Sequence, residues 1–319
     1  MSLLEVVDLH KSYGTHVAVN GLSFTVEAGE VFGLLGPNGA GKSTTMMMLA
    51  GLRSADSGSV TIAGHSFDSG RDELKRILGV VPQDLAIYPD LTARENLAFF
   101  GKLYGIRGAA LKQRVEGILD QIGLTENANN YGHTFSGGMK RRLNFGVALL
   151  HQPKFVILDE PTVGVDPQSR SHLLDCVRRL SADGVGLIYA SHYMEEVEAL
   201  CHRVAIIDKG KLLTCGTLDQ LLSDSRADLH LRVRGHRDRL GSRLVGLADV
   251  EPDSEVNGEP EVQVVLRRDR RDSPFAINDR LILVLEILKQ AKAEILSMET
   301  KEHNLERLFL ELTGRRLRD

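Results

Sequence analysis

The chain has 319 residues, of which 39 are lysine or arginine and 43 are aspartate or glutamate, giving a formal net charge of −4. No stretch approaches the roughly 20 apolar residues that a membrane-spanning helix needs, and the start MSLLEVVDLH lacks the basic and apolar regions of a secretory signal. The three scattered cysteines exclude a disulfide framework or a cysteine-rich metal site. We therefore expect a cytoplasmic protein with one domain of about 220 residues and a smaller one behind it.

The distribution of charge gives no support to a nucleic-acid-binding surface. The stretch from Ser225 to the end holds 18 basic and 18 acidic residues, which leaves 21 basic and 25 acidic residues in front of it. Because neither part is basic overall, no nucleic-acid partner is expected.

The first predicted elements are two short strands, at residues 3–9 and 22–26, which flank a turn at Lys11-Ser-Tyr-Gly14. Tyr13 would present its ring on this turn, where it could stack on a nucleotide base. A tyrosine that simply lies on a surface turn is the alternative, and it is the more common case for such a residue taken alone.

Residues 31–49 have the order strand, glycine-rich loop, helix. Residues 36–44, GPNGAGKST, fit the phosphate-binding pattern G-x-x-x-x-G-K-[ST]. The glycines let the backbone form a nest of N–H groups for phosphate oxygens, and the helix adds its positive N-terminal end. Lys42 would reach the β- and γ-phosphates, and the Ser43 hydroxyl suits Mg²⁺. The predicted ligands are a nucleoside triphosphate and magnesium, held by Gly36, Pro37, Asn38, Gly39, Ala40, Gly41, Lys42, Ser43 and Thr44.

Two further strands are predicted at residues 59–62 and 77–82, and the second ends at Gln83. An amide at the carboxyl end of a strand can reach a bound ion or water, although a lone glutamine is more often an ordinary loop residue.

From Leu91 to Gly123 apolar residues recur every three or four positions, which predicts an all-helical insertion in a strand-and-helix core. Its exposed rim would be free to meet a partner.

The residues Ser136, Gly137 and Gly138 predict a second helix start that can bind an anion. Ser136 is a good N-cap, and the two glycines leave backbone N–H groups open. One nucleotide needs only one phosphate loop, so this second site is expected to serve the nucleotide held by another copy of the chain. The basic residues at 140–142 raise the alternative of an RNA contact, but such a cluster is more often a solvated helix face.

An apolar strand at residues 155–158 delivers two adjacent carboxylates, Asp159 and Glu160, at its carboxyl end. Because successive side chains on a strand point opposite ways, the two acids should have different tasks. The aspartate can anchor magnesium, usually through its water shell, and the glutamate can polarise and orient the attacking water.

Asp166 lies in a turn before a helix at about residues 169–181, and His192 follows a strand at 187–190. From a strand end His192 could donate to a γ-phosphate oxygen, although a lone histidine is more often an ordinary hydrogen-bonded residue. Glu196 lies one helical turn beyond His192 but has no third ligand nearby, so a metal pair is not predicted there.

Beyond residue 225 the pattern indicates a small α+β module. Apolar alternation predicts strands at 229–233 and 262–266, and helical spacing predicts a helix at 277–288. A short strand at 295–298 and a last helix at 305–312 complete it.

Taken together and in this order, the motifs of the first 220 or so residues resemble the nucleotide-binding domain of ABC transporters. The resemblance implies an α/β P-loop domain at residues 1–224, with a helical subdomain at about 84–140, followed by a C-terminal α+β domain at 225–319. It also implies a homodimer arranged head to tail with two ATP molecules between the copies. Each ATP would be held by the loop of one copy and by residues 136–138 of the other.

Position by position, Tyr13 resembles the adenine-stacking aromatic, and Gln83 the residue that links the nucleotide to the transmembrane partner. Asp159 is similar to the Walker B aspartate and Asp166 to the D-loop aspartate, while Glu160 and His192 resemble the catalytic glutamate and the switch histidine. The resemblance thus implies the catalytic residues Lys42, Glu160 and His192 and the Mg²⁺ ligands Ser43, Gln83 and Asp159.

The wording Ser-Gly-Gly-Met-Lys-Arg-Arg at 136–142 is similar to that of ATPases serving ABC-2 type permeases, such as antibiotic-resistance, nodulation-factor and sodium exporters. The implied function is ATP hydrolysis that drives export through a separate multi-span permease, with this chain on the cytoplasmic face of the inner membrane. A soluble ABC-type ATPase acting on ribosomes or nucleic acid is an alternative, disfavoured because the chain has no second phosphate loop and no sustained heptads. A transporter ATPase used for import or for lipid release is a further alternative.

Overall fold

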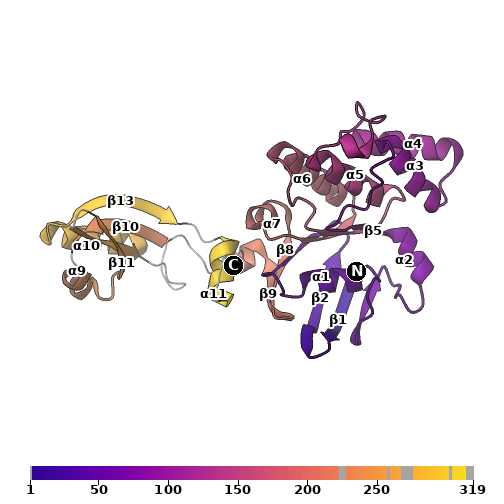
Figure 1. Ribbon diagram of the computed structural model, residues 1–319. Coiled ribbons are helices and arrows are strands. Elements are labelled where there is room, and N and C mark those ends of the chain that lie inside the picture. Colours follow the sequence, from indigo (N-terminus) through magenta and orange to yellow (C-terminus); the bar gives the residue numbers. More distant parts are fainter. Residues whose placement is uncertain are drawn as a thin grey trace. The chain divides into compact units, whose positions relative to one another are not determined.

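The computed structural model describes residues 2–222, 228–235, 237–256, 259–266, 276–301 and 304–313. The chain divides into two compact units. One consists of Met1–Leu218 with Phe309–Asp319, and the other of Asp219–Leu308 (Figure 1).

The larger unit is built on a six-stranded sheet with the order β5-β6-β7-β3-β8-β9. Its strands are β3 (Val31–Leu35), β5 (Leu78–Val81), β6 (Phe155–Asp159), β7 (Gly186–Ala190), β8 (Arg203–Asp208) and β9 (Lys211–Thr217). Neighbouring strands from β5 to β8 pair in parallel, and β9 runs antiparallel to β8. Strands β3 and β7 are buried throughout, as their continuous apolar sequences require. The carboxyl ends of β3, β5, β6 and β7 therefore lie along one edge of the sheet.

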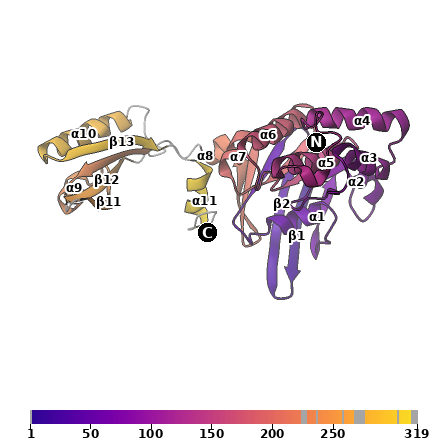
Figure 2. The same cartoon turned by 45° about the horizontal axis from the view of Figure 1, so that its top comes forward.

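A second, antiparallel sheet has the order β2-β1-β4, with β1 (Ser2–Tyr13), β2 (His16–Glu27) and β4 (Ser57–Ile62). The two strands predicted at 3–9 and 22–26 are present but longer than predicted. The prediction of a turn at 11–14 was wrong, because pairing continues to Ser12 with Val17 and Tyr13 with His16. The turn is confined to Gly14 and Thr15, and Gly14 supplies the positive φ of 58° that such a tight hairpin needs. Both cartoon views show this hairpin projecting away from helices α3 and α4 (Figures 1 and 2).

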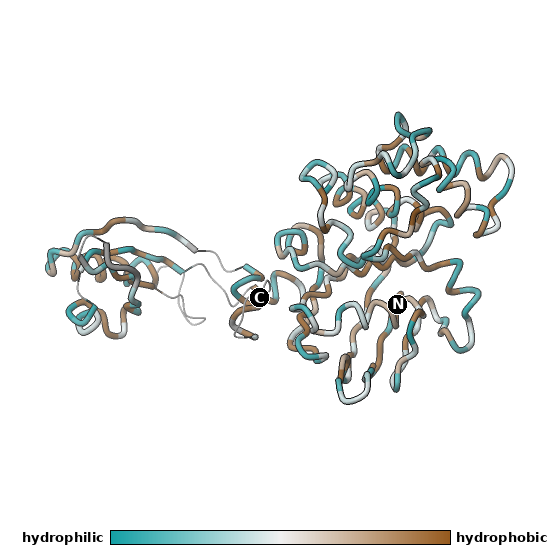
Figure 3. The backbone as a smooth tube through the Cα atoms, viewed as in Figure 1, coloured by the Kyte–Doolittle hydropathy of each residue, from teal (hydrophilic) through white to brown (hydrophobic). Residues whose placement is uncertain are grey.

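The hydrophobic core of the larger unit joins the two sheets through helix α1 (Lys42–Leu49). It combines Val6 and Phe24 of the antiparallel sheet, Phe32 and Ile157 of the six-stranded sheet, and Met46 of α1. Burial of each such side chain contributes about 1.5–3 kcal/mol. The chain at the centre of this unit is correspondingly hydrophobic, and many of its outer loops are hydrophilic (Figure 3). The phosphate-loop helix is thus anchored on its apolar side.

The predicted helical insertion is confirmed, and it contains α3 (Ala93–Leu103) and α4 (Gly108–Gln121). Thr92 and Glu95 form a capping box at the start of α3. The fully buried Asn96 amide donates to the carbonyl oxygens of Tyr88, Leu91 and Thr92, which ties α3 to the segment after Gln83. The other helical elements of this unit are α2 (Arg71–Ile77), η1 (Gly132–Thr134), α5 (Gly137–Leu149), α6 (Pro167–Ala182) and α7 (Met194–Leu200). No helix within the described ranges is long and apolar enough to cross a membrane.

The smaller unit starts with α8 (Leu218–Leu222) at the boundary and then has the order β10 (Asp228–Arg234), α9 (Arg237–Leu244), β11 (Asp249–Val256), β12 (Glu259–Leu266), α10 (Ala276–Gln290) and β13 (Glu294–Lys301). Its antiparallel sheet has the order β11-β12-β10-β13, a split β-α-β arrangement. Leu231, Val264, Leu240 and Val284 are members of its core. The last helix of the chain is α11 (Leu305–Thr313).

Two elements of this unit had no clear signal in the sequence. Helix α9 buries only Leu240 and Leu244 among mostly charged and small residues. Strand β11, DVEPDSEV, lacks apolar alternation and is held instead by its pairing with β12. The residues beyond Thr313 lie outside the described ranges.

Candidate active site

The glycine-rich loop connects β3 to α1, and close backbone approaches determine its shape. A Cβ on Gly36 would lie 2.4 Å from the carbonyl oxygen of Ile207, so only glycine fits there. A Cβ on Gly41 would lie 2.3 Å from the carbonyl oxygen of Ala18, and its φ of 105° is itself a glycine conformation. No side chain caps the start of α1, so its first N–H groups are available to an anion.

The side chain of Lys42 curls back into this loop. Its Nζ donates to the carbonyl oxygens of Gly36 at 2.6 Å and Pro37 at 3.1 Å, and the residue is only 6% exposed. Burial lowers the pKa of the Lys42 ammonium, and the negative charges of Glu160 and Asp159 oppose that shift. The loop therefore holds a positive charge at its centre beside two carboxylates.

A cavity of about 260 Å³ opens over the loop and brings several predicted site residues together. Its lining includes Tyr13, Pro37, Asn38, Gly39, Gly41, Lys42, Ser43, Thr44, Gln83 and Glu160. Tyr13 is 43% exposed and, as part of this lining, lies beside the loop. A tyrosine on an unrelated surface turn would have no reason to lie there. His16 and Ala18 also line the cavity and were missed. The two-residue hairpin pairs Tyr13 with His16 and so brings His16 to the cavity. Recognition of this tight turn in the sequence would have predicted that His16 lies beside Tyr13.

The two carboxylates lie where β6 ends. Asp159 is the last residue of the strand, and Glu160 turns away with a positive φ of 48° while its N–H donates to the carbonyl oxygen of Ala190 at 3.0 Å. Such a backbone conformation costs about 1–3 kcal/mol in a residue other than glycine and is typical of functional sites. Burial and then the charge of Glu160 raise the pKa of Asp159, and Lys42 and the Ser43 hydroxyl oppose that rise.

The residues at this edge fit a magnesium ion. Asp159 Oδ1 is buried and has no hydrogen-bond partner among the described residues, so it is an oxygen whose lone pairs could bind a cation. The Ser43 hydroxyl and the Gln83 amide line the adjoining cavity. Within the described ranges no group of three or more His, Cys, Asp or Glu residues could hold a metal. The oxygens on offer at this edge are those of a carboxylate, a hydroxyl and an amide, which are the hard ligands that magnesium prefers.

Two side chains from distant parts of the sequence converge on Glu160. Gln83 Nε2 donates to Glu160 Oε2 at 3.2 Å, and His192 Nδ1 lies 3.4 Å from Glu160 Oε1. Arg141 of α5 donates to the carbonyl oxygen of Gln83, which ties this residue to the start of that helix. The Glu160 carboxylate thus has a polar side chain beside each of its oxygens.

The second predicted anion site lies at the start of α5. The prediction that Ser136 is an N-cap is confirmed, because its Oγ accepts from the N–H of Met139 at 3.2 Å. A Cβ on Gly138 would lie 2.3 Å from Ser169 Oγ and 2.5 Å from Asp166 Oδ2, so α5 packs closely on the start of α6. Asp166 caps α6 by accepting from the N–H of Ser169 at 2.9 Å. Residues 136–138 do not line the cavity over the loop of their own chain.

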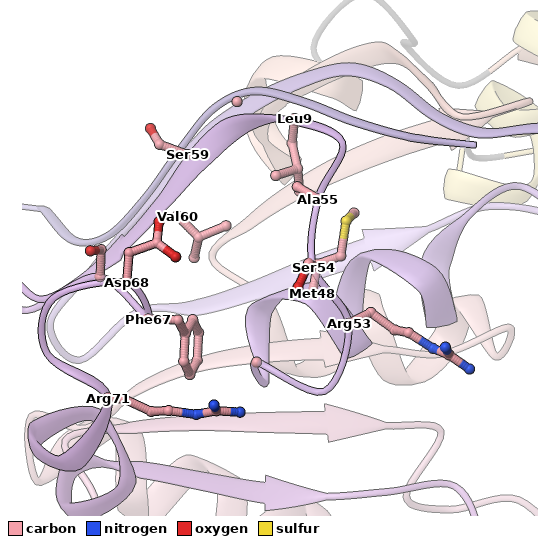
Figure 4. A pocket seen from close by; sticks show the side chains of 13 residues that line it. Leu9, Met48, Arg53, Ser54, Ala55, Ser59, Val60, Phe67, Asp68 and Arg71 are labelled. Carbon is pink, nitrogen blue, oxygen red and sulfur yellow. The ribbon is translucent and has the colours of Figure 1, made fainter. Parts of the chain in front are cut away.

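A separate cavity of about 260 Å³ lies beside the C-terminal end of α1, with Met48, Arg53, Val60, Phe67 and Arg71 in its lining. The ring of Phe67 points into it (Figure 4). None of the predicted site residues lines this cavity.

Comparison with known proteins identifies the family. Residues 19–163 match the model of a family described as ABC transporter. The linearmycin resistance ATP-binding protein LnrL of Bacillus subtilis is 45% identical over 99% of this chain and 100% of its own length. The Nod factor export ATP-binding protein I of Ralstonia nicotianae is 35% identical over 99% of this chain and 95% of its own length.

Among solved structures, an ATP-binding subunit of an ABC transporter is 31% identical, with a TM-score of 0.64 over 70% of this chain and 92% of its own. Its fold confirms the prediction of a P-loop ABC-type α/β domain. The linearmycin resistance protein and the Nod factor export protein are at least 35% identical to this chain over nearly its whole length. Identity at this level over this length shows that the chain belongs to the same family. The chain therefore belongs to the ATP-binding proteins of ABC transporters, a family of ATPases.

Proposed function

We propose that the chain is the ATP-hydrolysing subunit of an ABC-2 type exporter and works on a separate multi-span permease. The two relatives named above carry resistance and export in their names, and they align with this chain along nearly its full length. The observation that carries the catalytic part is the convergence of Gln83 and His192 on Glu160 beside the glycine-rich loop.

ATP would bind in the cavity over the loop, with its phosphates on backbone N–H groups of the glycine-rich loop and its base against Tyr13. The Lys42 ammonium would exchange its contacts with loop carbonyl oxygens for the β- and γ-phosphates. A magnesium ion held by Ser43, Gln83 and Asp159 would neutralise charge on the β- and γ-phosphates.

Hydrolysis would depend on Glu160. Its carboxylate would orient and polarise a water for attack on the γ-phosphate. His192, held 3.4 Å from it, would fix that carboxylate and could donate to a γ-phosphate oxygen. Asp159 and Glu160 would then have different tasks, the first in holding the metal and the second in activating water.

Two copies would complete each site in a head-to-tail dimer. The start of α5 offers the N–H groups of Gly137 and Gly138, yet it lies outside the cavity over the loop of the same chain. A second copy would bring this helix start to the γ-phosphate, so that ATP closes the dimer and hydrolysis reopens it. Asp166, packed against Gly138, would accompany the helix start into that interface.

The permease would dock on the helical insertion and the segment after Gln83. Several large apolar side chains there are exposed, namely Leu85 at 40%, Tyr88 at 48%, Phe99 at 37% and Leu103 at 68%. Tyr88 and Phe99 pack edge to face with ring centroids 4.9 Å apart. Because this segment begins at Gln83, which contacts Glu160, a docked permease would sense the state of the nucleotide site. The chain would thus act on the cytoplasmic face of the membrane.

Co-purification of the tagged protein from its own cell's membranes in mild detergent tests the transporter assignment. We expect a multi-span membrane protein in stoichiometric amount, recovered less well when Leu103 and Phe99 are both replaced by serine. Replacement of Leu52, which is 69% exposed and lies three residues after the end of α1, by serine is the matched control. Recovery only in the soluble fraction, with ribosomes or nucleic acid attached, would overturn the proposal.

A further inference from the structure

Glu196 is a buried carboxylate that the chemistry described above does not use. It lies on α7 and is only 3% exposed. Its Oε2 accepts three hydrogen bonds from hydroxyl groups, namely from Tyr189 Oη at 2.7 Å, Thr162 Oγ1 at 2.8 Å and Ser191 Oγ at 3.1 Å. A buried charge is costly unless it is paired and hydrogen-bonded, so this arrangement is built around the carboxylate.

The three donors come from the segments that carry the proposed catalytic residues. Thr162 lies two positions after Glu160, and Ser191 immediately precedes His192. Tyr189 lies on β7, where it pairs with Leu158 of β6. Ser191 Oγ also accepts from the N–H of Tyr193 at 2.9 Å, which anchors the chain on both sides of His192. One carboxylate oxygen thus fastens the end of β6 to the end of β7.

The other oxygen of Glu196 faces the third relevant segment. Arg170 of α6 forms an ion pair with it, with Nε 3.3 Å from Oε1. The same guanidinium lies 4.6 Å over the ring of Tyr193, whose centroid is 4.2 Å from that of the His192 ring. Helix α6 begins one residue after Asp166, so the network reaches the helix that Asp166 caps.

We propose that Glu196 is a positioning residue that holds His192 and Glu160 at their separation of 3.4 Å and aligns them with the start of α6. This inference rests on the proposed ATPase chemistry of that pair. Burial and the Glu196 charge raise the pKa of Tyr189, so its hydroxyl stays protonated and remains a donor. Glu196 touches neither nucleotide nor water in this scheme and acts through the two segments that it joins.

The test is steady-state ATP hydrolysis together with equilibrium ATP binding for Glu196→Ala, Glu196→Gln and Ser191→Ala. Misplacing a catalytic group by a fraction of an ångström to one ångström lowers turnover by roughly ten- to a hundredfold. We expect such a fall in kcat for Glu196→Ala with little change in ATP affinity. Glu196→Gln keeps an acceptor oxygen but loses the charge that pairs with Arg170, so it should retain more activity than the alanine variant.

The matched control is Glu195→Gln on the exposed face of the same helix, which should keep wild-type kcat. Wild-type kcat in Glu196→Ala would overturn the proposal. A fall in kcat matched by an equal fall in ATP affinity would also overturn it, because it would indicate a general loss of structure. Where the alanine variant does not fold, wild-type kcat in both Glu196→Gln and Ser191→Ala overturns it. Absence of hydrolysis in the wild-type protein would instead refute the proposed function.

Discussion

The imidazole of His192 lies against the carboxylate of Glu160, with 3.4 Å between Nδ1 and Oε1. These residues follow two different strands, β6 and β7, which pair in parallel so that their carboxyl ends adjoin. Gln83, which follows β5, reaches the other oxygen of the same carboxylate. Three neighbouring strands thereby direct three side chains to one point beside the glycine-rich loop.

Glu160→Gln should stop turnover while leaving ATP binding intact. The amide keeps the size of the side chain and can still meet Gln83, but it cannot polarise a water as the carboxylate does. We expect a fall in kcat of about 10²–10⁴-fold. The variant should also form an ATP-bound dimer that elutes as a larger species in gel filtration with ATP and Mg²⁺. A wild-type ATPase rate in the purified variant would show that another group acts as the base.

Gly138→Ala and Gly137→Ala should behave differently although the residues are adjacent. A Cβ at position 138 would lie 2.3 Å from Ser169 Oγ, whereas one at 137 would have the Gly164 carbonyl oxygen at 3.4 Å as its nearest neighbour. Overpacking of this kind costs about 1–3 kcal/mol. Chemical denaturation should show that loss for Gly138→Ala alone, and ATP hydrolysis should fall with it. Equal behaviour of the two variants would contradict the close packing of α5 on α6.

Asp159→Asn should stabilise the nucleotide-free protein near neutral pH. Burial and Glu160 raise the pKa of Asp159 above its ordinary value of 3.8, so the folded protein binds this proton more tightly than the unfolded chain does. The stability of the wild-type protein therefore falls as pH rises through the window above 3.8, and an asparagine does not titrate. We expect the melting temperature of the variant to exceed that of the wild type at about pH 7, with the difference shrinking towards about pH 4.

Thermal unfolding across that pH range measures the effect, and Asp120→Asn, at an exposed position on α4, is the control that should show no such trend. The same Asp159 variant should lose the extra stabilisation that Mg²⁺ adds to bound ATP, because the substitution removes the carboxylate proposed to bind the ion. A difference in melting temperature that does not change with pH would mean that the burial of Asp159 is not what destabilises the wild type.

Tyr13→Ala should weaken ATP binding without weakening the binding of inorganic triphosphate. Stacking of a base on an aromatic ring contributes about 1–3 kcal/mol, and the triphosphate has no base to stack. Tyr13→Phe keeps the ring and should bind ATP like the wild type. Calorimetric titration of ATP and of inorganic triphosphate into the wild type, Tyr13→Ala and Tyr13→Phe measures these affinities. Loss of affinity for both ligands in Tyr13→Ala would place the ring in the structure of the hairpin and not on the base.

The local sequence was sufficient to predict the elements whose formation depends on neighbouring residues. The glycine-rich loop between an apolar strand and a helix, the N-cap at Ser136 and the helical insertion were all predicted, because each depends on residues within a few positions of one another. The strands missed or misplaced were those whose own sequence carries little apolar alternation and which form by pairing with the next strand of a hairpin. The extension of β1 to Tyr13 depends on pairing with β2, and β11 depends on β12.

The sequence by itself determined which chemical groups are present and that they follow strand ends, including a basic residue, two carboxylates, an amide and a histidine. Only the tertiary structure decided that Gln83 and Glu160, 77 positions apart, share a hydrogen bond, and that Glu196 joins the segments after β6 and β7. The physical reason is that a parallel sheet aligns the carboxyl ends of strands that are remote in sequence. Their order, β5-β6-β7-β3, is a property of the assembled sheet and not of any one segment.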